Sequence, residues 1–327
     1  VLLVALLSLS VPTPVKATWT KDTSVGSSKN WRSITSSSDG TKLAAVGNGE
    51  KIWTSTDSGV TWTSVLSSDN TAMIKDWRSI TSSSDGTKLA AVVNDGNIWT
   101  STDSGGNWIS VGSSKKWISI TSSSDGTKLA AVVNDGNIWT STDSGGNWIS
   151  VGSSKNWYAI TSSSDGTKLA AVVYNGNIWT STDSGGTWIP VGSSKKWTEI
   201  TSSSDGTKLA AVIYGGNIWT STDSGGTWIS VGSSKNWYAI TSSSDGTKLA
   251  AVVYNGNIWT STDSGGTWIS EGSSKNWKSI TSSSDGTKLA AAAMGGNIWI
   301  YSSPCDASAE PTHGGVGTCT SSLASGS

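Results

Sequence analysis

The stretch WYAITSSSDGTKLAAVVYNGNIWTSTDSGGTWIPVGSSKK, residues 157–196, decides the fold because the chain repeats it. Residues 237–276 differ from it at only three positions. The period is 40 residues, except for a first unit of 46 that carries extra residues within 66–77. Self-similarity at such a period indicates a repeat architecture. Seven tryptophans begin the pattern WxxITSSSDGTKLAA: Trp31, Trp77, Trp117, Trp157, Trp197, Trp237 and Trp277.

Each unit reads as four short strands joined by turns. In the quoted unit these are strand A (157–163), strand B (168–173), strand C (177–182) and strand D (187–192). Asp-Gly and other Gly-containing turns lie between them, which is typical of antiparallel hairpins. No window has the apolar spacing of an amphipathic helix. A four-stranded unit of this length has the size of one propeller blade, so the sequence predicts an all-β, seven-bladed β-propeller of four-stranded antiparallel blades.

The two ends of the repeat array predict how the ring closes. The seventh unit stops at about residue 304 and lacks strand D, whereas 18–28 (TWTKDTSVGSS) resembles a strand D without a unit of its own. We therefore expect the N-terminal strand to complete the last blade, which removes the open sheet edges of a linear array. The predicted domains are a partial signal peptide at 1–17, the propeller at 18–304 and a tail at 305–327.

The segments outside the repeats bear on location and redox state. Residues 1–17 have the short apolar core and small-residue end of a secretory signal, so we expect a secreted, extracellular protein. Export to an organelle lumen is an alternative interpretation of the same segment. The Ser/Gly-rich tail holds both cysteines, Cys305 and Cys319. In an oxidising compartment they could close one small loop, and free thiols or an intermolecular bridge are the alternatives.

The motif SxDxGxxW recurs at the C–D turn of six units, for example STDSGGTW at 181–188. It resembles the Asp-box (BNR) repeat of sialidases, sortilin-type receptor domains, photosystem II assembly-factor propellers and many secreted propellers. The resemblance covers about residues 18–304. It implies that the Asp accepts backbone N–H groups within the turn, that the Gly permits a positive φ and that the Trp packs over the hairpin. The structural Asp residues that it implies are Asp57, Asp103, Asp143, Asp183, Asp223 and Asp263.

The same resemblance does not assign a function, because the family includes enzymes, receptors and scaffolds. Sialidase chemistry would require three arginines on the substrate carboxylate, and the chain has only Arg32 and Arg78. The single histidine, His313, lies in the tail, so the propeller is not expected to hold a Ser-His-Asp triad or a His-based metal site. We therefore predict a protein that is not an enzyme and that uses no cofactor and no metal.

Comparison of the units with one another separates two faces of the expected disc. In propeller topology the A–B and C–D turns share one face, and these turns hardly vary. The B–C turns and D–A crossovers share the other face, where the units differ. The first face carries seven Lys against thirteen Asp, and the second carries twelve Lys and Arg against seven acidic residues. A formal net charge of −1 thus describes a polar disc with no general attraction to nucleic acid.

We predict that the basic face binds the ligand, since aromatic rings beside cationic groups suit an anionic glycan or an acidic protein loop. Solvated lysines that serve only solubility are the plainer alternative. Opposite charge on the two faces also predicts head-to-tail association of discs. The predicted ligand-binding residues are Arg32, Arg78, Tyr158, Tyr174, Tyr214, Tyr238, Tyr254 and Lys278.

The sequence therefore predicts a secreted, non-enzymatic binding or structural propeller with a glycan or protein ligand. Two alternatives stay open: a glycan-active hydrolase with an atypical site, and an organellar propeller factor of the photosystem-assembly type. The apolar run at 1–11 is too short for a membrane span, so none is expected.

Overall fold

The computed structural model describes residues 18–65 and 73–302, and this part of the chain consists of β-strands and turns without a helix. An all-β fold is thus confirmed. The strands are β1 (Thr18–Lys21), β2 (Lys29–Ser36), β3 (Leu43–Glu50), β4 (Trp53–Ser55), β5 (Thr63–Ser64), β6 (Lys75–Ser82), β7 (Leu89–Ser101), β8 (Ile109–Ser122), β9 (Leu129–Ser141), β10 (Ile149–Ser162), β11 (Leu169–Ser181), β12 (Ile189–Ser202), β13 (Leu209–Ser221), β14 (Ile229–Ser242), β15 (Leu249–Ser261), β16 (Ile269–Ser282), β17 (Lys288–Gly296) and β18 (Ile298–Ser302).

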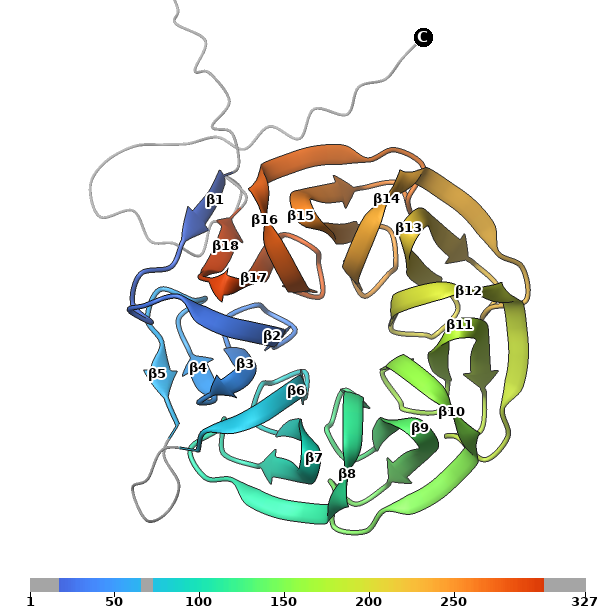
Figure 1. Cartoon of the computed structure of the whole chain (residues 1–327), viewed down its shortest axis with the longest axis horizontal. Helices are drawn as coiled ribbons and strands as arrows, with labels where there is room; N and C mark the ends of the chain where they lie inside the picture. The colour runs from blue at the N-terminus through green and yellow to red at the C-terminus, as the bar shows by residue number, and fades with distance from the viewer. Residues whose placement is uncertain (1–17, 66–72, 303–327) are drawn as a thin grey trace, which may run out of the picture.

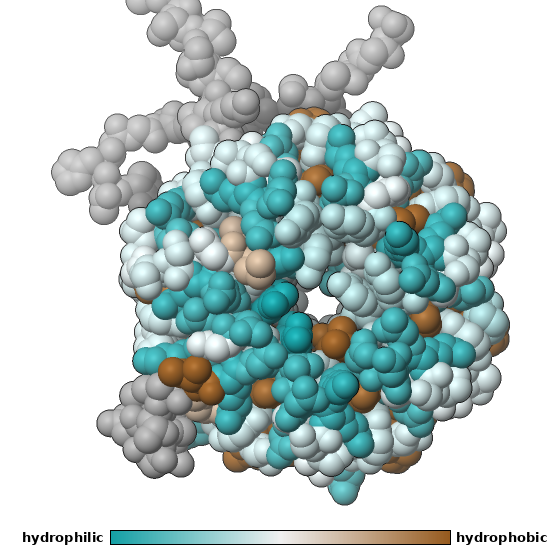
Figure 2. All heavy atoms as spheres, in the orientation of Figure 1, coloured by the Kyte–Doolittle hydropathy of each residue, from teal (hydrophilic) through white to brown (hydrophobic). Residues whose placement is uncertain are grey.

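The strands form a ring of radial, antiparallel sheets around a central opening (Figure 1). The strands that reach the centre are β2, β6, β8, β10, β12, β14 and β16, and each contains one of the repeated tryptophans. Figure 2 shows the opening in a largely hydrophilic face, with hydrophobic residues beside it and at the rim. β1 pairs with β18, from Thr18 opposite Ser302 to Lys21 opposite Trp299. The first described strand therefore lies on the outer edge of the last repeat's sheet.

The strands of the middle repeats are longer than the sequence predicts. The first repeat shows the expected order β2-β3-β4-β5, but later repeats join B with C, as in β11, and D with the next A, as in β12. The cause is that the B–C turn and the D–A crossover pair with each other, as Tyr174 does with Lys196. Segments that we expected to be loops thus take part in the sheet.

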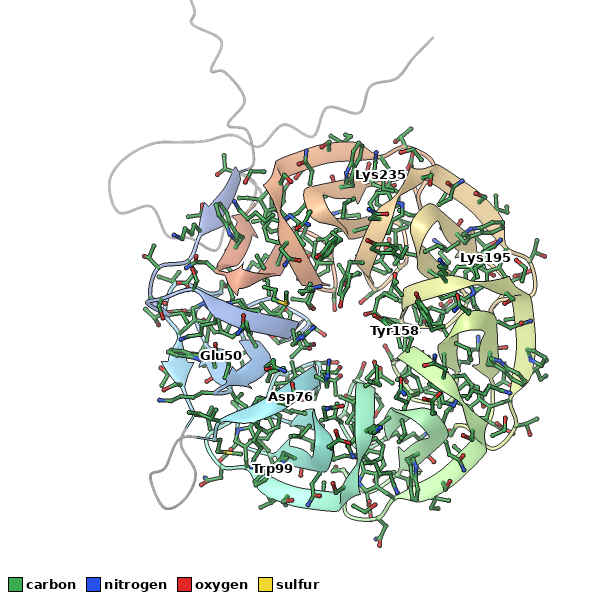
Figure 3. The ribbon with its side chains drawn as sticks, viewed as in Figure 1. Glu50, Asp76, Trp99, Tyr158, Lys195 and Lys235 are labelled. Atoms are coloured by element: carbon green, nitrogen blue, oxygen red, sulfur yellow. The ribbon has the colours of Figure 1, made fainter. Side chains whose placement is uncertain are left out.

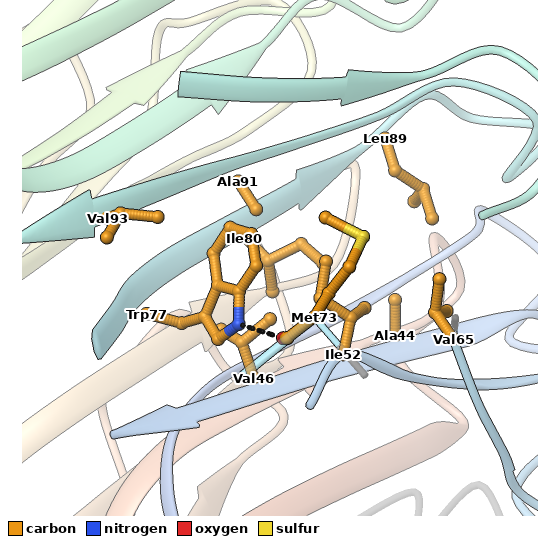
Figure 4. Packing of buried hydrophobic residues seen from close by; sticks show 10 residues of the cluster. All are labelled: Ala44, Val46, Ile52, Val65, Met73, Trp77, Ile80, Leu89, Ala91 and Val93. Carbon is orange, nitrogen blue, oxygen red and sulfur yellow. Dashed lines mark hydrogen bonds between the residues drawn. The ribbon is translucent and has the colours of Figure 1, made fainter. Parts of the chain in front are cut away.

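The hydrophobic core lies between neighbouring repeats. In the cluster of Figure 4, Val46 and Ile52 of the first repeat pack with Trp77 and Ile80 of the second. Trp77 Nε1 also donates a 3.4 Å hydrogen bond to the Met73 carbonyl. The seven inner tryptophans are at most 1% exposed. Because removal of a buried Trp costs about 3–5 kcal/mol, these residues hold one repeat to the next.

Backbone hydrogen bonds connect the A–B turns around the channel. The N–H of Ser38 donates to the Ser84 carbonyl at 2.7 Å, and the same contact recurs from repeat to repeat until Ser284 donates to Ser38. The serines of these turns, with their neighbours, line a hollow of about 220 Å³ at this end of the channel.

The SxDxGxxW turns are held by their own carboxylates. Asp143 accepts hydrogen bonds from the Asn147 backbone N–H and from the Ser141 hydroxyl, both at 2.8 Å. These bonds, that of Asn147 foremost, lower the pKa of Asp143 to about 2. Gly145 has a φ of 94°, a conformation that favours glycine, and its carbonyl accepts the Trp148 Nε1–H at 3.0 Å. These local hydrogen bonds hold the turn that joins strands C and D.

Several predictions concern residues outside the described part of the chain. They are the signal peptide at 1–17, the disulfide between Cys305 and Cys319, and the tail at 305–327. Within the described part there is no helix with the length and apolarity to cross a membrane.

Candidate ligand-binding face

The turns of the repeats are distributed over two faces. Ser104, in a C–D turn, donates its N–H to the Thr87 carbonyl of an A–B turn at 2.8 Å, and Lys42 Nζ reaches the Ser104 hydroxyl at 3.3 Å. The B–C turns and D–A crossovers pair with each other, as Gly176 and Lys195 do. We call the surface formed by the B–C turns and D–A crossovers the variable face, because the repeats differ in sequence there.

A β-bulge in each inner strand positions one residue of this face. In the ladder between β12 and β13, Trp197 lies opposite Ile213 and Glu199 opposite Val212, so Thr198 is the extra residue. The same shift follows the buried tryptophan in every repeat. Bulges redirect side chains and are frequent beside functional sites. The bulge residues are Arg32, Arg78, Ile118, Tyr158, Thr198, Tyr238 and Lys278.

The structure brings the five predicted tyrosines together. The ring centres of Tyr158 and Tyr174 are 5.6 Å apart, those of Tyr238 and Tyr254 are 6.3 Å apart, and Tyr214 lies 6.3 Å from Tyr254. Tyr158 lies near the central opening (Figure 3). Burial, and then the neighbouring Tyr238, raise the pKa of Tyr158, so its hydroxyl stays protonated at neutral pH.

Lys278 belongs to the same cluster. Its Nζ lies 4.0 Å from the ring centre of Tyr238 and 4.6 Å from that of Tyr254, which is cation–π geometry. The residue is only 8% exposed. Burial, and then the charge of Arg32, lower the pKa of Lys278 to about 8. No carboxylate in the described part of the chain forms an ion pair with it.

The two arginines follow Lys278 on the next two repeats. Arg32 is close enough to Lys278 to influence its pKa. Arg78 has a carboxylate of its own, since its Nη2 lies 3.6 Å from Asp76. The Nε of both arginines is buried without a hydrogen-bond partner among residues 18–65 and 73–302. Among the cationic bulge residues, Lys278 and Arg32 therefore form no ion pair with a described carboxylate.

The lysines of the D–A crossovers have a role that the sequence analysis missed. Lys195 Nζ lies 4.6 Å from the ring centre of Trp219, and the equivalent distances in the other repeats run from 4.3 to 5.1 Å. These ammonium groups cover the strand-C tryptophans, so they are structural as well as solvated. The pairs are Lys29–Trp53, Lys75–Trp99, Lys115–Trp139, Lys155–Trp179, Lys195–Trp219, Lys235–Trp259 and Lys275–Trp299.

Glu199 is a further site residue, which the sequence analysis counted only as a surface charge. Burial of its carboxyl group raises the pKa of Glu199 to about 8, although Oε1 accepts the Ile200 N–H at 3.2 Å. The ionised form of Glu199 also contributes to the raised pKa of Tyr158. The sequence does contain a signal for this residue, because every other repeat has Ser or Ala at the equivalent position. Those residues are Ser33, Ser79, Ser119, Ala159, Ala239 and Ser279.

Other parts of the described chain offer less chemistry. Within it, no three His, Cys, Asp or Glu residues are placed to hold a metal ion. A cavity of about 700 Å³ lies between the last and first repeats, where Leu43 and Val60 face Leu289 and Ile300. Its lining is mainly apolar and lies away from the variable face. The tyrosine cluster with Lys278, Arg32 and Glu199 is the better candidate, because Lys278 and Arg32 form no ion pair among residues 18–65 and 73–302.

Comparison with known proteins identifies the fold. No family model and no curated protein matches the chain. Among solved structures, YCF48 from Cyanidioschyzon merolae aligns with a TM-score of 0.69 at 16% identity, over 88% of this chain and 99% of that one. A structure of YCF48 bound to a D1 peptide aligns with a TM-score of 0.69 at 18% identity, over 90% of this chain and 100% of that one.

A glycoside hydrolase is similar as well. The GH74 xyloglucanase from Xanthomonas campestris aligns with a TM-score of 0.67 at 14% identity, over 87% of this chain and 53% of that one. At such identities the likeness establishes architecture and not activity. The chain is a β-propeller.

Proposed function

We propose that the chain is a secreted, closed, seven-bladed propeller of the Asp-box type that acts as a non-enzymatic binding module. The seven repeats, the pairing of β1 with β18 and the hydrogen bond from Ser284 to Ser38 support a closed ring. The signal-like segment at 1–17 supports secretion.

The ligand of this proposal is an acidic segment of another protein, held on the variable face. The observation that carries it is that Lys278 and Arg32 form no ion pair among the described residues, while Lys278 lies over the rings of Tyr238 and Tyr254, on repeats that are otherwise nearly identical. An anionic group near Lys278 would offset the cost of its burial, and the rings offer apolar area to neighbouring side chains. A protein of similar fold, YCF48, binds a D1 peptide.

Fluorescence anisotropy with a labelled Asp/Glu-rich peptide tests the proposal, with the matching Asn/Gln peptide as the uncharged control. We expect saturable binding that weakens with salt and that falls by about tenfold in Arg32→Gln and in Lys278→Met. Lys116→Gln removes the same charge from an exposed lysine and should change little. Equal effects of all three substitutions, or no binding, would contradict the proposal.

The same assay distinguishes an acidic protein segment from the other ligand classes. Stronger retention of an anionic polysaccharide than of the peptide would favour a glycan-binding module. Preference for the D1 peptide over the Asp/Glu-rich peptide would favour a photosystem-assembly type of factor, since YCF48 has been solved with a D1 peptide bound.

A glycan-active hydrolase is the second candidate, and Glu199 is the observation that favours it. A carboxyl whose pKa is about 8 is protonated at neutral pH, as a general acid must be. Release of reducing sugar from xyloglucan, lost in Glu199→Gln, would support this candidate. No release under conditions in which a GH74 enzyme is active would leave the binding module.

A further inference from the structure

Two repeats carry the same pair of tyrosines on the same sequence. Residues 157–189 and 237–269 are identical, so Tyr158 and Tyr174 correspond to Tyr238 and Tyr254. In the second pair, the ammonium group of Lys278 from the following repeat lies over both rings, 4.0 and 4.6 Å from their centres. The protein thus shows which chemical group this arrangement of rings accommodates.

The first pair meets a different residue. Thr198 occupies the bulge where the other repeat has Lys278, and its hydroxyl lies 3.3 Å from the Val212 carbonyl and 3.2 Å from the Trp237 carbonyl. Its side chain is short and already engaged with the backbone. Over the described residues, no lysine or arginine lies above the ring of Tyr158 or Tyr174.

The geometry of the first pair remains close to that of the second. The rings of Tyr158 and Tyr174 are 5.6 Å apart with an interplanar angle of 30°, against 6.3 Å and 33° for Tyr238 and Tyr254. An increase of about 0.7 Å in ring separation would reproduce the pair that holds an ammonium, and side chains at a binding surface move by that much.

The residue that follows the bulge also differs between the two repeats. Ser279 follows Lys278, whereas Glu199 follows Thr198 and contributes to the raised pKa of Tyr158. One repeat therefore supplies a cation and a neutral neighbour, and the other supplies a carboxyl group and no cation. The raised pKa of Glu199 agrees with this difference, because a cation beside the carboxyl would favour its ionised form.

We propose that Tyr158, Tyr174 and Glu199 form a binding site for an ammonium group that a ligand supplies. The rings would contact the cation through their π faces, and Glu199, which is protonated in the free protein at neutral pH, would release its proton to solvent on binding and become the counter-charge. The chemistry suits the side chain of a lysine or a quaternary ammonium. This site does not depend on the binding of an acidic segment, although a segment with both charges could reach Lys278 as well.

The test uses two cationic probes, N-acetyl-lysine methylamide and choline, with N-acetyl-norleucine methylamide as the neutral control. Isothermal titration and tyrosine ring NMR shifts report binding to the whole chain. We expect one equivalent of at least one cationic probe to bind, at least about tenfold tighter than norleucine amide. The stronger of the two cationic probes identifies a peptide or a small-molecule source.

Four variants locate the site. Thr198→Lys would place a lysine of the chain itself over the first ring pair and abolish binding. Lys278→Thr would free the second ring pair and add a second, weaker binding site, because Ser279 supplies no carboxyl group there. Because Thr198 is buried, Glu199→Gln and Tyr174→Ala give independent evidence, each expected to weaken binding by about tenfold. Equal affinity for norleucine amide, no binding of either cation, or binding that Glu199→Gln and Tyr174→Ala leave unchanged would overturn the proposal.

Discussion

The backbone N–H of Ser284 donates a 2.7 Å hydrogen bond to the carbonyl oxygen of Ser38, although these residues lie in the last and the first repeat of the chain. β1 and β18 make a second connection between the same two ends. Because each repeat buries its apolar face only against its neighbours, contacts between the ends protect two faces that would otherwise meet water.

Trp19→Ala tests the contribution of β1. Trp19 lies 5.3 Å from Tyr301 and 6.5 Å from Trp277, ring centre to ring centre. Because Trp19 is only partly buried, we expect the substitution to lower the free energy of unfolding by about 2 kcal/mol in urea denaturation, less than the loss of a fully buried tryptophan. Thr20→Ala, at an exposed position of the same strand, should change it by less than about 0.5 kcal/mol. Equal effects would show that packing of this indole does not hold the strand.

Adjacent lysines give a matched test of the ammonium–tryptophan contacts. Lys195 covers the ring of Trp219, whereas Lys196 is exposed. We expect Lys195→Ala to cost about 1 kcal/mol of unfolding free energy and Lys196→Ala to cost almost nothing. The two variants have the same net charge. An equal loss of unfolding free energy in both would therefore mean that the change in charge, and not the contact with the Trp219 ring, causes the loss.

The A–B turns should make the protein resistant to acid. The Ser83 hydroxyl, followed by the Thr87 backbone and hydroxyl, lowers the pKa of Asp85 from 3.8 to about 2. A lowered carboxyl pKa contributes stability above the unfolded value, and this contribution is lost as the pH falls through about 2. We expect tryptophan fluorescence to remain native at about pH 4 and to change mainly near pH 2–3.

The equivalent aspartates of other repeats allow a control for this prediction. Asp125→Asn combined with Asp205→Asn removes two titrating groups of the same kind. Stability of this variant should depend less steeply on pH in the acid range. An unchanged slope would mean that these carboxylates titrate alike in the folded and unfolded chain.

Glu199 should make stability fall toward alkaline pH. Its pKa is raised from 4.5 to about 8, so the folded state favours the neutral form. The associated stability is fully present below about pH 4.5 and is lost as the pH rises through about 8. We expect the wild type to lose a few kcal/mol between about pH 5 and pH 9, as measured by urea denaturation, and Glu199→Gln to lose much less.

The sequence alone predicts the all-β propeller fold well. The period, the Asp-Gly turns and the uniform tryptophans are local signals repeated seven times, so each repeat supports the interpretation of the others. The loop lengths are less predictable. The pairing of Tyr174 with Lys196 joins the B–C turn to the D–A crossover, and no local sequence pattern predicts this pairing.

The sequence predicts which residues belong to the candidate site, but not how their side chains are arranged. Variation among repeats points to Tyr158 and Lys278 as residues of one face. It cannot show that Lys278 lies over Tyr238 and Tyr254, because that contact depends on side-chain directions across two repeats. The burial that raises the pKa of Glu199 also depends on neighbours from other repeats, and a single sequence does not reveal them.

The bulge after each buried tryptophan has an evolutionary consequence. Trp197 and Ile200 keep the repeat folded, while the residue between them at the bulge can be threonine, tyrosine, lysine, arginine or isoleucine in different repeats. Mutation at this position can therefore change what the surface recognises while the scaffold stays intact. Duplication of a whole repeat copies a recognition element together with its support, and a single later substitution in the next repeat can give the two copies different ligands.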